Sequence, residues 1–181
     1  MTIQIKNRKV DSYSLLIVAN YLKNKEDYLN IILVCKKFKK TLKKFRYNPI
    51  PITNKKLFPL LQTQYLYSKD EKFIPEVNLY KIYYPISYSQ YLEYQQKENI
   101  KCLKIYFDKK DVQNHFKGEF PEVVHELKSF CFEGNKNITS LIIPSFITKL
   151  NDYCFCNLEE LKEIQFLLIP ENFENMKFLI L

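Results

Sequence analysis

Glycine, histidine and tryptophan are scarce in this chain, which has 2 Gly, 2 His and no Trp in 181 residues. The two glycines, Gly118 and Gly134, cannot build a glycine-rich phosphate loop, and the common nucleotide-binding motifs are absent. The two histidines, His115 and His125, leave little for a metal site or for histidine-based catalysis. We therefore expect a protein that is not an enzyme, with no catalytic residue, metal, cofactor or small-molecule substrate.

Long apolar runs are also missing. The first residues lack the apolar stretch of a signal peptide, and no run approaches the roughly 20 residues that a membrane span needs. The cysteines are odd in number and form no C-x-x-C pair; they are Cys35, Cys102, Cys131, Cys154 and Cys156. We expect an intracellular protein, of cytoplasm or nucleus, whose thiols are reduced and mostly buried.

Apolar and basic residues are abundant instead. A hydrophobic fraction of 46% is enough for a folded core, and the length fits one domain or one domain with a small appendage. The net charge of +8 is uneven, because no acidic residue occurs between Asp27 and Asp70. One basic patch lies within this gap and comprises Lys36, Lys37, Lys39, Lys40, Lys43, Lys44 and Arg46. Such a patch can bind an anionic partner or can simply be solvated.

The N-terminal residues 12–46 have the apolar spacing of helices. Apolar side chains recur at intervals of three and four residues on both sides of Asn24. Asn24 followed by Glu26 and Asp27 is typical of a helix start, and Asn48-Pro49 ends the helical stretch. We predict a helical hairpin or a small helical cluster over residues 12–46.

This helical stretch, with Val34-Cys35-Lys36-Lys37-Phe38 near its end, resembles the F-box. Ser12-Tyr13-Ser14 stands where that family has Leu-Pro. The resemblance implies an adaptor that contacts a ubiquitin-ligase subunit. The implied contact residues are Leu15, Leu16, Val34, Cys35 and Phe38. The alternative is a helical cap that only shields one end of the following domain.

The C-terminal part contains a repeat with a fixed offset. Residues 121–127 align with 144–150, and at the same offset Phe130-Cys131-Phe132 aligns with Tyr153-Cys154-Phe155. Each copy ends in the pattern apolar-x-x-apolar-x-apolar. This pattern occurs at Ile138/Leu141/Ile143 and Leu161/Ile164/Phe166, and also at Val77/Tyr80/Ile82, Ile100/Leu103/Ile105 and Met176/Leu179/Leu181. We interpret each instance as a strand with its apolar residues facing inward, and the remainder of each repeat as a return segment.

The aromatic-Cys-Phe block and the following apolar pattern resemble the BspA-like leucine-rich repeat family. The resemblance implies an α+β fold in which a helical segment (1–50) caps a short leucine-rich-repeat solenoid (51–181) with a curved parallel sheet. Its clear repeats are 121–143 and 144–166, its degenerate repeats cover 57–120, and its last strand is 176–181. Gly134 aligns with Asn157, so both should take positive φ in the return turn.

These features predict a non-enzymatic protein–protein interaction module. Its strand positions between the apolar residues should face solvent and bind a protein partner; they include Lys104, Thr139, Ser140, Ile142, Glu163 and Gln165. The F-box-like segment adds a ubiquitin-ligase adaptor subunit as a second partner. The alternative function is electrostatic binding of nucleic acid or of an anionic membrane through the basic patch.

Overall fold

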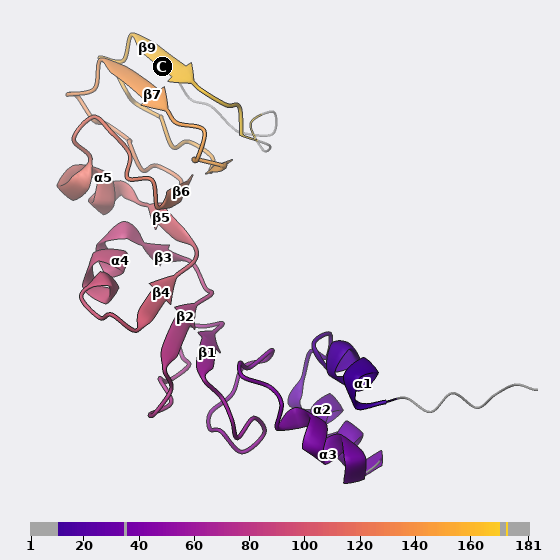
Figure 1. Cartoon of the computed structure of the whole chain (residues 1–181). Helices are drawn as coiled ribbons and strands as arrows, with labels where there is room; N and C mark the ends of the chain where they lie inside the picture. The colour runs from indigo at the N-terminus through magenta and orange to yellow at the C-terminus, as the bar shows by residue number, and fades with distance from the viewer. Residues whose placement is uncertain (1–10, 35, 171–172, 174–181) are drawn as a thin grey trace, which may run out of the picture. The chain divides into compact units, whose positions relative to one another are not determined.

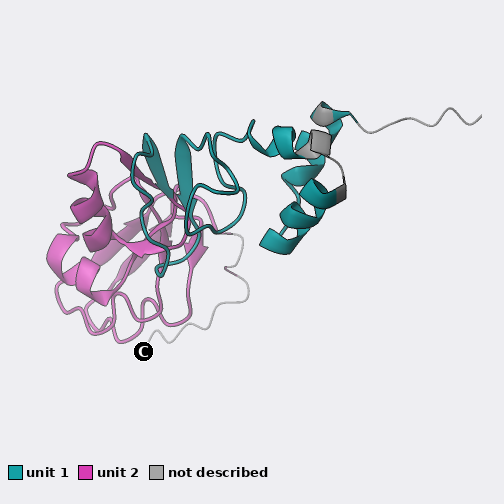
Figure 2. Cartoon of the chain, turned by 90° about the horizontal axis from the view of Figure 1, so that it is seen from below, with its two compact units in different colours: residues 1–81 teal, residues 82–181 magenta. Residues whose placement is uncertain are grey.

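The computed structural model describes residues 11–34, 36–170 and 173, and it forms two compact units, residues 1–81 and 82–181 (Figure 2). The sequence-based boundary at residue 50 lies inside the first unit and stays a prediction. Within the described residues, no helix combines the length and apolar character needed to cross a membrane.

Unit 1 begins with three helices, α1 (Ser12–Ala19), α2 (Lys25–Val34) and α3 (Lys36–Leu42) (Figure 1). The carboxylate of Asp11 accepts the Ser14 amide at 2.7 Å and caps α1. Asn24 accepts the Asp27 amide at 2.9 Å and caps α2, as the sequence predicted. Both α1 and α2 pack against α3. The predicted helical segment is therefore present as a small cluster of three helices.

Aromatic side chains form the centre of unit 1. The Tyr28 and Phe58 rings meet edge to face with centroids 5.4 Å apart, and Phe45 packs on Phe58 at 5.3 Å. The buried Tyr28 hydroxyl donates a hydrogen bond to the carbonyl of Ala19, which ties α2 to the end of α1. Burial, with smaller contributions from Tyr47 and Asp27, raises the pKa of Tyr28 to about 12.

Two strands follow, β1 (Thr63–Leu66) and β2 (Leu79–Ile82), and they are hydrogen-bonded neighbours. The last residue of β2 lies just beyond unit 1. The buried Asn48 amide donates to the Tyr65 carbonyl at 2.8 Å, and its oxygen accepts the Tyr65 amide at 2.7 Å. The buried Gln64 side chain similarly joins the carbonyl of Lys72 and the amide of Ile74. Asn48 thus satisfies backbone groups of β1, and Gln64 satisfies backbone groups that lie outside the strands.

Unit 2 contains two parallel sheets. The first has strand order β3 (Ile86–Ser87), β5 (Ile105–Phe107), β6 (Val124–Leu127), β8 (Lys149–Leu150). The second pairs β7 (Ser140–Ile143) with β9 (Glu163–Phe166). The helices α4 (Tyr88–Gln95) and α5 (Lys109–His115) lie on one side of these strands in Figure 1. A further strand, β4, spans Ile100–Cys102.

The strand register confirms the predicted repeat. In the second sheet Leu141 pairs with Ile164 and Ile143 with Phe166. In the first sheet Leu127 pairs with Leu150, at the same offset. Earlier strands pair at shorter offsets, as Ile86 does with Ile105, and the register shifts after Ile105 where β5 meets β6.

Two predictions about the strands are wrong. Residues 100–105 form no single inward-facing strand, because β4 ends at Cys102, Leu103 is 43% exposed and Ile105 begins β5. The Leu103 amide donates to the Ile82 carbonyl of β2 at 3.1 Å, whereas the Lys104 carbonyl accepts the Ile86 amide of β3 at 3.0 Å. The chain therefore passes from one sheet to another at Leu103 and Lys104. Each clear repeat also holds two short strands, such as β6 and β7, because its return segment pairs as well. The predicted last strand, 176–181, lies outside the described residues.

The return turns repeat the backbone conformation as predicted. Gly134 has φ 68° and Asn157 has φ 53°, so both take the left-handed conformation. Phe130 and Tyr153 share a φ near 60°, and their rings stack with centroids 5.4 Å apart. Cys131 is buried, and burial together with the neighbouring Cys154 raises its pKa well above the ordinary thiol value. This thiol packs in the core as a small apolar group.

Candidate functional site

The outward positions of β7 and β9 form one candidate surface. Ser140 lies opposite Glu163 in the register, and Ile142 lies opposite Gln165. All four are exposed, and Ile142 is 54% exposed although Leu141 and Ile143 on either side of it are buried. The structure therefore places these four predicted residues together, with exposed Thr139 directly before β7.

Lys104 belongs to another part of unit 2. It lies in the connection between β4 and β5, and its ammonium group is 4.3 Å from the centre of the Tyr83 ring. Lys104 is exposed, and it also forms this cation–π contact within the chain.

The helices of unit 1 expose a second candidate surface. Leu15 is buried and Leu16 is half-buried, whereas the side chains of Val34 and Phe38 and all of Cys35 lie outside the described residues. The exposed apolar side chains are different ones. We call Tyr13, Ile17, Val18, Tyr21, Leu29 and Leu33 the helical apolar surface. Tyr21 is 79% and Leu33 82% exposed. Sequence reasoning missed this surface, although the absence of charge from 12–19 signalled it.

A groove of about 580 Å³ adjoins this surface along α2. Its apolar lining consists of Leu29, Ile32, Pro51, Ile52 and Leu57. Lys25 and Lys56 also line the groove and supply positive charge, and Glu71 adds a carboxylate. Leu29 belongs to both features, so the groove continues the exposed face of α2.

The basic patch is exposed wherever its side chains are described. These residues are Lys39, Lys40, Lys43, Lys44 and Arg46; the side chains of Lys36 and Lys37 lie outside the described part. The Arg46 guanidinium donates weakly to the Leu60 carbonyl at 3.4 Å.

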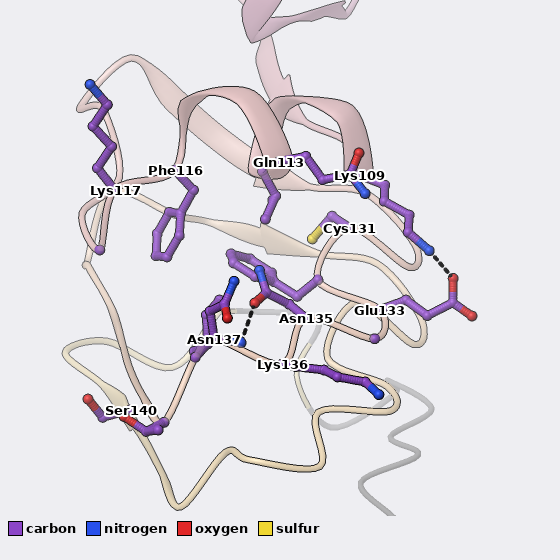
Figure 3. Close-up of a pocket in the computed structure, with 16 residues that line it drawn as sticks. Lys109, Gln113, Phe116, Lys117, Cys131, Glu133, Asn135, Lys136, Asn137 and Ser140 are labelled. Carbon is purple, nitrogen blue, oxygen red and sulfur yellow. Dashed lines mark hydrogen bonds and ion pairs between the residues drawn. The ribbon is translucent and has the colours of Figure 1, made fainter.

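Unit 2 contains a cleft of about 620 Å³ between α5 and residues 131–140 (Figure 3). Gln113 and Phe116 enter it from α5 and its end, and Asn135 and Asn137 enter it from the opposite wall. Both glycines of the chain, Gly118 and Gly134, line it as well. Sequence reasoning did not predict this cleft.

Asp111 and His115 of unit 2 form hydrogen bonds within the fold. The buried Asp111 carboxylate accepts the amides of Ser89 at 2.9 Å and of Asp108 at 3.2 Å, which joins the starts of α4 and α5. His115 contacts the Ser89 hydroxyl at 3.2 Å. Among the described residues, no group of three His, Cys, Asp or Glu side chains is placed to hold a metal ion.

A comparison with protein families matches part of this architecture. Residues 107–178 match the family model described as "BspA type Leucine rich repeat region (6 copies)". This match begins at the last residue of β5 and covers α5 and all strands from β6 to β9. No curated protein matches the chain. No solved structure matches it either. The predicted resemblance is thus confirmed over residues 107–178, which are similar to a BspA type leucine-rich repeat region.

Proposed function

We propose that the protein is a non-enzymatic adaptor that binds one protein partner through its helices and another through its repeats. Leucine-rich repeats are generally protein-interaction modules, and such arrays use extended surfaces for binding. The observation that carries the proposal is the helical apolar surface, in which six large apolar side chains of α1, α2 and the segment between them are exposed. Large exposed apolar areas often mark binding sites for other proteins.

The helical apolar surface and the adjoining groove favour an apolar partner segment. Aromatic anchors such as Tyr21 often contribute most of the binding energy of an interface, and burial of the exposed Leu33 would add hydrophobic stabilisation. Lys25 and Lys56 in the groove favour acidic residues beside the apolar face of the partner. In line with the F-box resemblance, the proposed partner is a ubiquitin-ligase adaptor subunit.

The exposed face of β7 and β9 is the proposed surface for the second partner. Ile142 supplies an apolar contact, and Thr139, Ser140, Glu163 and Gln165 surround it with polar groups. An apolar centre with a polar rim is the usual composition of a protein interface.

Affinity capture from cell extract with identification of the bound proteins tests the proposal. The wild-type chain should retain a ligase adaptor subunit, and the double variant Tyr21→Ser/Leu33→Ser should lose it. Ile142→Ser should lose the second partner only. Leu60→Ser is the control, because Leu60 is exposed but does not line the groove. Absence of a ligase subunit from the wild-type fraction would overturn the adaptor role.

The second candidate function is electrostatic binding of nucleic acid or anionic membrane, favoured by the exposed cations of the basic patch. It predicts an affinity for duplex DNA, RNA or phosphatidylserine vesicles that falls steeply as salt rises. Replacing Lys39, Lys40, Lys43 and Lys44 by Gln should abolish that binding. Binding that resists both changes would exclude this function.

A further inference from the structure

We propose that the cleft of unit 2, between α5 and residues 131–140, binds an extended acidic peptide segment of a partner protein. This inference rests on the proposed protein-binding function and assigns it a further site, which borders the β7–β9 surface at Thr139 and Ser140. The cleft volume of about 620 Å³ falls within the range of known ligand sites.

Carboxamides on both walls suit a peptide backbone. Gln113 comes from α5, and Asn137 comes from the opposite wall (Figure 3). The Asn135 oxygen already accepts the Asn137 amide at 2.9 Å and so fixes this wall. No other described residue forms a hydrogen bond with the side chains of Gln113 or Asn137. A carboxamide both donates and accepts, so each can pair with the N–H and C=O of an extended chain.

Charge selects an acidic segment. The Lys109 ammonium is paired with the Glu133 carboxylate at 2.8 Å, so these two charges compensate each other. Lys117 and Lys136 lie on different sides of the cleft and have no ion-pair partner among the described residues (Figure 3). Both ammonium groups point outward from the rim of the cleft (Figure 3), so acidic side chains would meet them where a bound peptide leaves the cleft.

The half-buried Phe116 ring gives the cleft an apolar contact between the polar groups. Its edge-to-face contact with Phe132, at 5.1 Å between centroids, fixes the ring in place. A bound segment therefore needs an apolar residue between its acidic residues. A small inorganic anion would leave this ring unused, which favours a peptide over such an anion.

The two glycines that line the cleft add no side chain to it. A Cβ atom at Gly118 or Gly134 would meet no atom within 4 Å. There is therefore space for a side chain at both positions. One repeat later Asn157 adopts the left-handed conformation of Gly134. The fold therefore tolerates a side chain in this turn, and its absence at Gly134 leaves room for a peptide backbone.

Selection of random peptides displayed on phage against the immobilised full chain tests the inference. Selected peptides should carry acidic residues on both sides of an apolar one. Fluorescence anisotropy of a labelled selected peptide should show about tenfold weaker binding for Lys136→Glu and for Lys117→Glu. Gln113→Leu should weaken binding about three- to tenfold through lost hydrogen bonds.

Matched controls lie on the same helix. Lys110→Glu and Asn114→Leu change exposed residues of α5 that do not line the cleft, and neither should alter binding. Equal losses in the control and cleft variants would overturn the site, as would selection of no acidic peptide. If these tests fail while Tyr21→Ser/Leu33→Ser still releases the ligase subunit, the adaptor function stands without this site.

Discussion

The helices of unit 1 and the strands of the repeats differ in how many of their apolar side chains they bury. In β7, Leu141 and Ile143 turn inward, and only Ile142 faces solvent as an apolar residue. In α1, α2 and the segment between them, six large apolar side chains remain exposed although Leu15, Ala19 and Tyr28 fill the core. The repeats bury their apolar residues by stacking on one another, whereas the helices leave apolar side chains exposed, which the proposed partner would cover.

The largest expected effect is on the repeat core. Leu127 is fully buried in β6, so Leu127→Ala should lower the free energy of unfolding by about 2–5 kcal/mol. Leu33→Ser, on the exposed face of α2, should change it by less than about 0.5 kcal/mol. Urea denaturation followed by circular dichroism measures both. Similar losses in the two variants would remove the contrast between the two regions.

Alkaline pH should weaken unit 1 through Tyr28. Its pKa of about 12 in the folded protein exceeds the ordinary value near 10, so only the unfolded chain ionises between these limits. Stability should be unaffected below about pH 10 and should fall by roughly 2–3 kcal/mol as the pH rises to about 12. Denaturation curves across this range should show a smaller fall for Tyr28→Phe. An equal fall would assign the effect to other tyrosines.

Acid should weaken the repeats through Glu126. Burial opposes its ionisation, but hydrogen bonds from Lys128 at 2.8 Å, Asn151 at 2.8 Å and Lys149 at 3.0 Å outweigh burial and lower its pKa. Its stabilising contribution is thus complete above the ordinary pKa near 4.3 and is lost as the pH falls through the lowered pKa. Glu126→Gln should cost about 1–2 kcal/mol at pH 7. The variant should also show a weaker acid dependence, and an unchanged acid profile would contradict this role.

The smallest effect is expected at the return turn. Gly134→Asn places there the residue that the next repeat uses at the same conformation, so stability should change by less than about 0.5 kcal/mol. Gly134→Val should cost about 1–3 kcal/mol, because a β-branched residue resists positive φ. Thermal unfolding of both variants distinguishes them, and equal costs would show that the two turns are not equivalent.

Periodicity predicted the parts of the fold that depend on local spacing. The repeat offset determined the pairing of β7 with β9, and the Gly134/Asn157 alignment predicted two left-handed turns. The strands β6 and β8 escaped prediction because they are short and lack alternation; in Val124–Leu127 only the two end residues are buried. In α1 the residues from Leu15 to Ala19 are all apolar, so spacing alone did not show that Leu15 faces inward while Ile17 and Val18 face outward.

The candidate sites also differ in whether local spacing in the sequence predicts them. The β7–β9 surface follows from strand alternation, so its four central residues could be named in advance. The cleft depends on how α5 faces residues 131–140, and Gln113 and Asn137 belong to no motif that announces a binding role. Such a site arises only from tertiary packing, which one sequence does not reveal.

The constant register of the last strands would allow further repeats to be added to the array. Both β6–β8 and β7–β9 pair at the same sequence offset, and backbone bonds from Phe132 to Cys154 and from Thr148 to His125 link the same two repeats. A duplicated copy of residues 144–166, inserted after Phe166, would offer the same hydrogen bonds to the strands before it. The array can therefore lengthen by whole modules, and a new outward face can evolve on each added module without disturbing the older ones.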